Sequence, residues 1–89
     1  MINQKRLISL IQRLIQIDSQ NPPGNETVIS EYIKAYFSAR DFDIKTYSFQ
    51  KNRPNVVVTL KGRLPRAQAA RKAILMTPHT DTVPLGSGW

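Results

Sequence analysis

The chain has 89 residues, no cysteine, and 13 lysines and arginines against 6 aspartates and glutamates, for a formal net charge of +7. The lack of cysteine excludes disulfides and thiolate metal sites, and no segment approaches the roughly 18 consecutive apolar residues of a membrane span. We therefore expect a small cytoplasmic chain without a membrane partner, of a size at which a single core is marginal.

Two amphipathic helices are predicted in the first half of the chain. The first covers residues 3–17, where apolar residues recur at three- and four-residue spacing. The second covers residues 26–39, with Asn25 as its cap and Glu26 in its first turn, near the positive end of the helix dipole. The two prolines and the glycine in residues 18–25 separate the helices, since proline cannot continue a helix.

Three strands are predicted in the second half. Residues 42–49 alternate between polar and apolar side chains, while residues 55–62 and 72–78 are nearly continuous apolar runs, typical of a sheet buried on both faces. Residues 63–71 are polar and basic and should form an exposed connection. The order helix, helix, strand, strand, strand indicates the α/β class. Because so few elements cannot cover both faces of such a sheet, we expect part of the domain to be missing.

The segment "PHTDTVP" contains the most informative pair of residues. His79, the one histidine, is followed two residues later by Asp81. In extended backbone, such side chains point to the same side. The carboxylate can then accept the proton of one imidazole nitrogen and leave the other nitrogen free, as in metal-binding histidines. A short His-x-Asp pattern also arises by chance in surface loops, and these two residues are too few for a zinc site.

Several stretches, taken in order, resemble the amino-terminal part of a zinc-dependent amidohydrolase family. They are "SQNPPGNE" (residues 19–26), "NVVVTLKG" (residues 55–62) and "AILMTPHTDTVPLGSGW" (residues 73–89). The family includes acetylornithine deacetylase, succinyl-diaminopimelate desuccinylase, aminoacylase and carboxypeptidase G. The resemblance covers nearly all of the chain and is poorest across residues 63–71.

This resemblance implies a fold and a mechanism. The fold is a three-layer, zinc-aminopeptidase-like catalytic domain with a mixed sheet, of which residues 1–89 are the amino-terminal portion. Family members hold two zinc ions, with cobalt as an alternative, and use a metal-activated water to cleave the amide of an N-acyl amino acid or small peptide. His79 matches the first metal ligand, and Asp81 matches the catalytic aspartate that orients it. The turn at residues 21–24 is given no chemical role.

The family's other metal ligands, its general base and the inserted domain that often forms a homodimer have no counterpart here. The resemblance therefore implies a fragment that is inactive by itself, and it leaves the acyl group and the substrate-binding residues open. The alternative is a small non-enzymatic module that binds nucleic acid or another polyanion. Residues 51–72 motivate it, with seven basic residues and no acidic one (Lys51, Arg53, Lys61, Arg63, Arg66, Arg71 and Lys72). No base-reading or RNA-stacking motif accompanies this charge.

Overall fold

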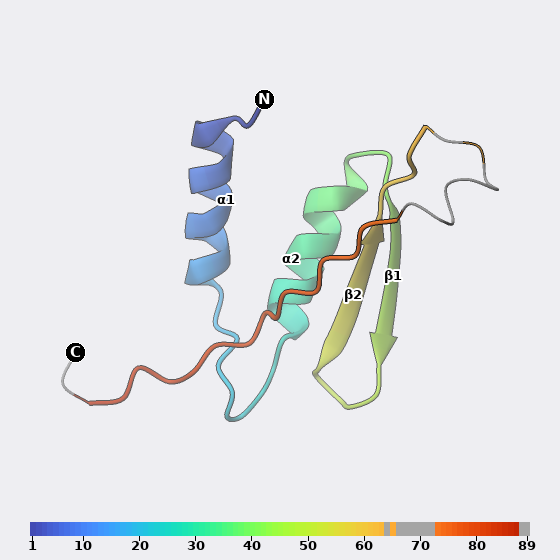
Figure 1. Ribbon diagram of the computed structural model, residues 1–89. Helices are drawn as coiled ribbons and strands as arrows, with labels where there is room; N and C mark the ends of the chain where they lie inside the picture. Colours follow the sequence, from blue (N-terminus) through green and yellow to red (C-terminus); the bar gives the residue numbers. More distant parts are fainter. Residues whose placement is uncertain (64, 66–72, 88–89) are drawn as a thin grey trace.

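The computed structural model, which describes residues 1–63, 65 and 73–87, contains two helices and a two-stranded antiparallel sheet, against which the second helix packs. The elements are α1 (Gln4–Gln16), α2 (Thr27–Ser38), β1 (Asp43–Ser48) and β2 (Pro54–Thr59). Figure 1 shows α2 between α1 and the hairpin of β1 and β2. The α/β class is confirmed, as are both helices and the first two strands, to within a few residues at each end. No helix in the described ranges is long and apolar enough to cross a membrane.

Asparagine side chains accept backbone hydrogen bonds near the start of both helices, as a cap for α1 and as a turn before α2. The side-chain oxygen of Asn3 accepts a hydrogen bond from the backbone N–H of Arg6 at 3.1 Å, at the start of α1. Before α2, the side-chain oxygen of Asn25 accepts a hydrogen bond from the backbone N–H of Thr27 at 3.2 Å. Each of these bonds satisfies a backbone donor that has no partner within the helix. The N-cap position of α2 is Glu26, whose side chain makes no capping hydrogen bond, so the cap predicted at Asn25 lies one residue further along the chain.

The hairpin is covered on one face, which corrects the expectation of a sheet buried on both faces. The strands pair in register from Asp43 opposite Thr59 to Ser48 opposite Pro54. Along β2, half-buried and exposed residues alternate, as expected for a strand with one covered face. Helix α2 supplies the cover, and its Ile29, 5% exposed, is the one buried hydrophobic residue in the described part of the chain.

The third predicted strand, residues 72–78, does not form in the part of it that the structure describes. Residues 73–78 carry no strand pairing and are exposed throughout, and β2 ends at Thr59 rather than at Gly62. A strand needs a neighbouring backbone to complete its hydrogen bonds, and β1 and β2 pair with each other in the described sheet. Lys72 and most of the predicted connection, residues 64 and 66–71, lie outside the described residues, whereas Arg63 and Pro65 are exposed as expected.

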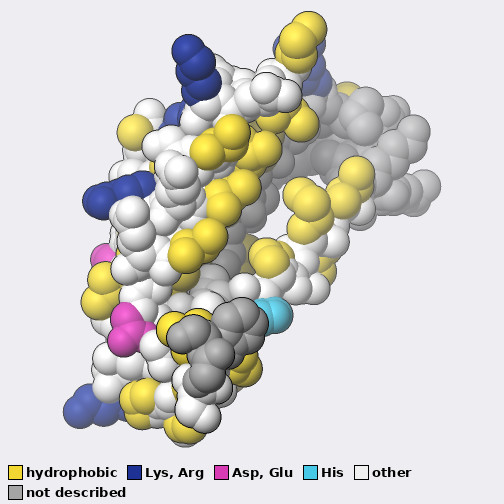
Figure 2. Space-filling model, turned by 90° about the vertical axis from the view of Figure 1, so that its left-hand side faces the viewer, with side chains coloured by type: hydrophobic (Ala, Val, Ile, Leu, Met, Phe, Trp, Pro, Cys, Tyr) yellow, Lys and Arg dark blue, Asp and Glu magenta, His cyan; other side chains and the backbone are white. Residues whose placement is uncertain are grey.

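The apolar stripe of α1 is only partly covered. Leu10, Leu14 and Ile17 are half-buried, whereas Ile8 and Ile15, on the same helical stripe, are exposed. Figure 2 views the molecule from the side on which α1 lies and shows hydrophobic side chains gathered in a band across that face. The helix therefore packs one edge of its apolar stripe and presents the other edge to solvent.

Candidate functional site

The carboxyl-terminal segment lies against the loop that follows α1 through a short parallel β-bridge. Gln20 and Thr82 form the bridge. The N–H of Asn21 donates to the carbonyl of Thr82 at 2.7 Å, and the N–H of Thr82 donates to the carbonyl of Ser19 at 3.0 Å. The hydroxyl of Ser19, a fully buried residue, donates to the carbonyl of Thr80 at 2.7 Å. Two segments some 60 residues apart in sequence are thereby held side by side.

His79 and Asp81 are in contact, as their spacing predicts. The Nδ1 atom of His79 lies 3.0 Å from the carboxylate Oδ1 of Asp81 and 3.0 Å from its backbone carbonyl oxygen. Both of these oxygens are acceptors, so Nδ1 is the ring nitrogen that carries the proton. In the neutral ring, the lone pair then belongs to Nε2. The imidazole is 85% exposed, which leaves Nε2 open to a ligand.

The second carboxylate oxygen of Asp81 faces two other donors. The side-chain amide of Asn21 donates to Oδ2 at 3.2 Å, and Nη2 of Arg53 lies 3.5 Å from the same oxygen. The hydrogen bond from Asn21 is the largest cause that holds the pKa of Asp81 below its ordinary value. Partial burial opposes this shift, while His79 and Arg53 add to it. Asp81 is consequently an ionised acceptor at neutral pH.

Arg53 is itself held by Glu26, whose side chain is only 6% exposed. Nε of Arg53 donates to one carboxylate oxygen at 3.2 Å, and Nη2 donates to the other at 2.9 Å. The hydrogen bond with Glu26 is the main cause that raises the pKa of Arg53. The backbone N–H of Glu26 also donates to the carbonyl of Asn52 at 2.8 Å, so the turn between β1 and β2 is joined to the start of α2.

Gly24 makes room for this ion pair. A Cβ atom at this position would lie 3.2 Å from both Cζ and Nε of Arg53, closer than ordinary van der Waals contact. The residue also has a φ of +80°, a backbone conformation that residues other than glycine rarely adopt. Both constraints favour glycine where the loop passes the guanidinium group.

The sequence predicted the contact between His79 and Asp81 but not the residues around it. The sequence patterns place Asn21 in a turn without a chemical role, Glu26 in the first turn of a helix and Arg53 in a basic stretch. Their spacings of 27 and 60 residues carry no local signal. Only the arrangement of the loop, the hairpin and the carboxyl-terminal segment brings the three together.

A complete zinc site is not formed by the described residues. His79 fits a metal ligand because one ring nitrogen is free and exposed. Within residues 1–63, 65 and 73–87, however, no group of three or more histidine, cysteine, aspartate or glutamate side chains could hold a metal ion. Zinc takes three or four protein ligands, and both oxygens of Asp81 already face His79, Asn21 and Arg53. These residues supply one ligand only.

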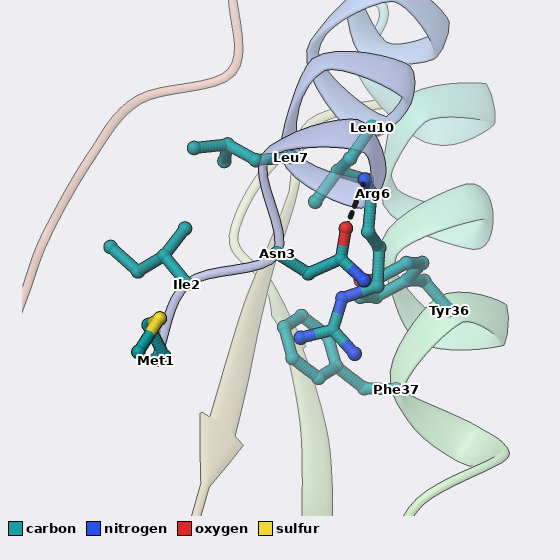
Figure 3. Close-up of a pocket in the computed structure, with 8 residues that line it drawn as sticks. All are labelled: Met1, Ile2, Asn3, Arg6, Leu7, Leu10, Tyr36 and Phe37. Atoms are coloured by element: carbon teal, nitrogen blue, oxygen red, sulfur yellow. Dashed lines mark hydrogen bonds between the residues drawn. The ribbon is translucent and has the colours of Figure 1, made fainter.

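A pocket of about 490 Å³ lies away from this site, between the start of α1 and the second half of α2. Figure 3 shows the lining side chains, which include Arg6, Leu7 and Leu10 of α1 and Tyr36 and Phe37 of α2. The pocket contains neither His79 nor Asp81 and is lined mainly by apolar side chains. It is the gap left where α1 packs incompletely on α2, and we assign no chemistry to it.

Comparison with known proteins gives one significant relative. The chain is 26% identical over 80 residues to N-formyl-4-amino-5-aminomethyl-2-methylpyrimidine deformylase of Halalkalibacterium halodurans. The match covers 89% of this chain but only 18% of the length of that enzyme. No family model matches the chain, and no solved structure matches it.

Proposed function

We propose that this chain is the amino-terminal portion of the catalytic domain of a metal-dependent amidohydrolase. The reaction is hydrolysis of the amide of a small N-acyl compound, which includes N-formyl compounds as well as N-acyl amino acids. The observation that supports this proposal most directly is the geometry of His79. Its Nδ1 atom faces two acceptors of Asp81, while the ring is exposed on the side of Nε2. The similarity to a deformylase supports the same class of reaction.

Two side chains of this chain have roles in the proposed site. Asp81 accepts the Nδ1 proton, which fixes the tautomer of His79 and keeps the Nε2 lone pair available for a metal. A bound zinc or cobalt ion lowers the pKa of water and polarises an amide carbonyl. The other ligands and the general base must come from polypeptide other than the described residues. We therefore expect the isolated 89-residue chain to hydrolyse no N-acyl substrate, with or without added zinc.

The alternative of a polyanion-binding module is not favoured. Arg53, one of the seven basic residues that motivate it, is paired with Glu26 and lies near Asp81, so its charge is largely offset. No observation among the described residues indicates a surface that reads nucleic acid.

A chimaera tests the proposed function directly. Residues 1–89 replace the matching stretch of the H. halodurans deformylase, and deformylation is measured with added zinc. We expect activity from the chimaera. We expect an Asp81→Asn variant to lose about 10- to 100-fold, as for partners that orient metal-binding histidines. His79→Ala should lose more, because it removes a ligand.

Asp43→Asn is the matched control, since it makes the same chemical change at an exposed position on β1. It should leave activity unchanged. A folded chimaera that deformylates nothing, or one whose activity survives His79→Ala, contradicts the proposal.

A further inference from the structure

We propose that Arg53, anchored by Glu26, is a positioning residue that orients the carboxylate of Asp81 and thereby selects the tautomer of His79. This inference rests on the proposed function of His79 as a ligand and deepens it. It assigns a role to a partly buried ion pair, whose two residues the sequence patterns place only at the start of a helix and in a basic stretch.

The guanidinium group has the donors for both carboxylates. Nη2 of Arg53 carries two hydrogens, and this nitrogen lies 2.9 Å from Glu26 Oε1 and 3.5 Å from Asp81 Oδ2. Nε makes the second bond to Glu26, so the plane of the guanidinium group is set by two contacts before Asp81 is reached. One arginine therefore links the start of α2 to the carboxyl-terminal segment.

This link determines which oxygen of Asp81 faces the imidazole. Oδ2 accepts a hydrogen bond from the amide of Asn21 and forms an ion pair with Nη2 of Arg53 at 3.5 Å. Oδ1 is left for Nδ1 of His79 at 3.0 Å. A carboxylate held by one oxygen cannot rotate freely, so its other oxygen is presented to the ring in a fixed direction. The ion pair with Glu26 thus fixes Arg53, which orients Asp81, which in turn orients the ring of His79 and its exposed Nε2 atom.

The anchoring residues belong to elements that are joined by a backbone hydrogen bond. Glu26 precedes α2 and is joined by its backbone N–H to the turn residue Asn52, and Arg53 directly precedes β2. Gly24 leaves the space that the guanidinium group fills. The carboxyl-terminal segment, by contrast, is held near the site by one β-bridge and by side-chain hydrogen bonds from Ser19 and Asn21, and its side chains are mostly exposed. The ion pair between Glu26 and Arg53 therefore fixes the position of Asp81 in a segment whose side chains pack little against the rest of the chain.

The test uses the full chain labelled with ¹⁵N and reads the tautomer of His79 from its ring nitrogen shifts, at a pH where the imidazole is neutral. In the wild-type chain, the Nδ1–H tautomer should dominate. The variant is Glu26→Gln with Arg53→Gln, which removes both charges together and so leaves no buried carboxylate unpaired. We expect the Nε2–H tautomer to become the major form, while the amide shifts of β1 and β2 stay in place. Zinc affinity at Nε2 should fall about 10-fold.

A variant that keeps the hairpin shifts and the Nδ1–H tautomer overturns the proposal. If the double variant with Glu26→Gln and Arg53→Gln is unfolded, a second double variant, Glu26→Gln with Arg53→Met, is measured instead. Its His79 tautomer is read in the same way. If the second double variant is also unfolded, the proposal is overturned, because Arg53 then has a purely structural role. The tautomer is read without any substrate, so an inactive chimaera with a shifted tautomer counts against the proposed function alone. An active chimaera with an unchanged tautomer counts against the role of Arg53 alone.

Discussion

Glu26 and Arg53, 27 residues apart in sequence, are joined by two hydrogen bonds of 3.2 and 2.9 Å across a nearly buried carboxylate. Removing the arginine alone leaves that carboxylate without its charge partner, which is more costly than removing both charges. We predict that Arg53→Gln destabilises the chain more than the double change of Glu26→Gln and Arg53→Gln. Urea denaturation of the two single variants and the double variant measures this non-additivity. Additive effects would show that the pair is uncoupled.

The small core predicts a large cost for one substitution on α2. Ile29 is 5% exposed, whereas its neighbour Val28 is 63% exposed. Ile29→Ala should cost about 2 kcal/mol or more, because it removes buried methyl groups and leaves a cavity. Val28→Ala, the matched control, should change stability by less than about 0.5 kcal/mol. Thermal unfolding, monitored by circular dichroism, compares the stability of the two variants. Equal losses of stability would place the core elsewhere.

Acid should weaken the docking of the carboxyl-terminal segment. The pKa of Asp81 is lowered in the folded chain, mainly by the hydrogen bond from Asn21. Its contribution to stability is therefore fully present above the ordinary aspartate pKa of about 4 and is lost as pH falls through the lower folded value. The amide shift of Thr82, which donates to Ser19 in the bridge, should report this loss. Asp81→Asn should remove the pH dependence, and a dependence that persists would assign it to another group.

The exposed edge of α1 predicts self-association. Ile8 and Ile15 are 55% and 77% exposed on one helical stripe, which is the kind of apolar patch that favours contacts between molecules. Changing both to glutamine should reduce association, as measured by light scattering across a concentration series, with little loss of helix. Ser9→Gln, at an exposed polar position of the same helix, is the control and should change nothing. Equal association in both variants would place the contact on another surface, such as the edge of β2.

The helices, the first two strands and the contact between His79 and Asp81 could be predicted from the sequence because each depends on residues close together in the chain. Helical spacing places the apolar stripe of α1, and two-residue spacing in extended backbone brings an imidazole to a carboxylate. The prediction failed for residues 73–78, whose apolar composition suits a strand but which have no neighbouring strand in the described structure.

The surroundings of Asp81 depended on tertiary structure alone. Asn21, Glu26 and Arg53 come from a loop, a helix start and a strand start, and nothing in their local sequence indicates that they meet at one carboxylate. Charge and hydrogen-bonding capacity can be counted along a chain, but the partners of a long polar side chain depend on which backbone segments are brought within a few ångströms. Here the β-bridge between Gln20 and Thr82 joins the loop to the carboxyl-terminal segment, and the hydrogen bond from Glu26 to Asn52 joins the start of α2 to the hairpin.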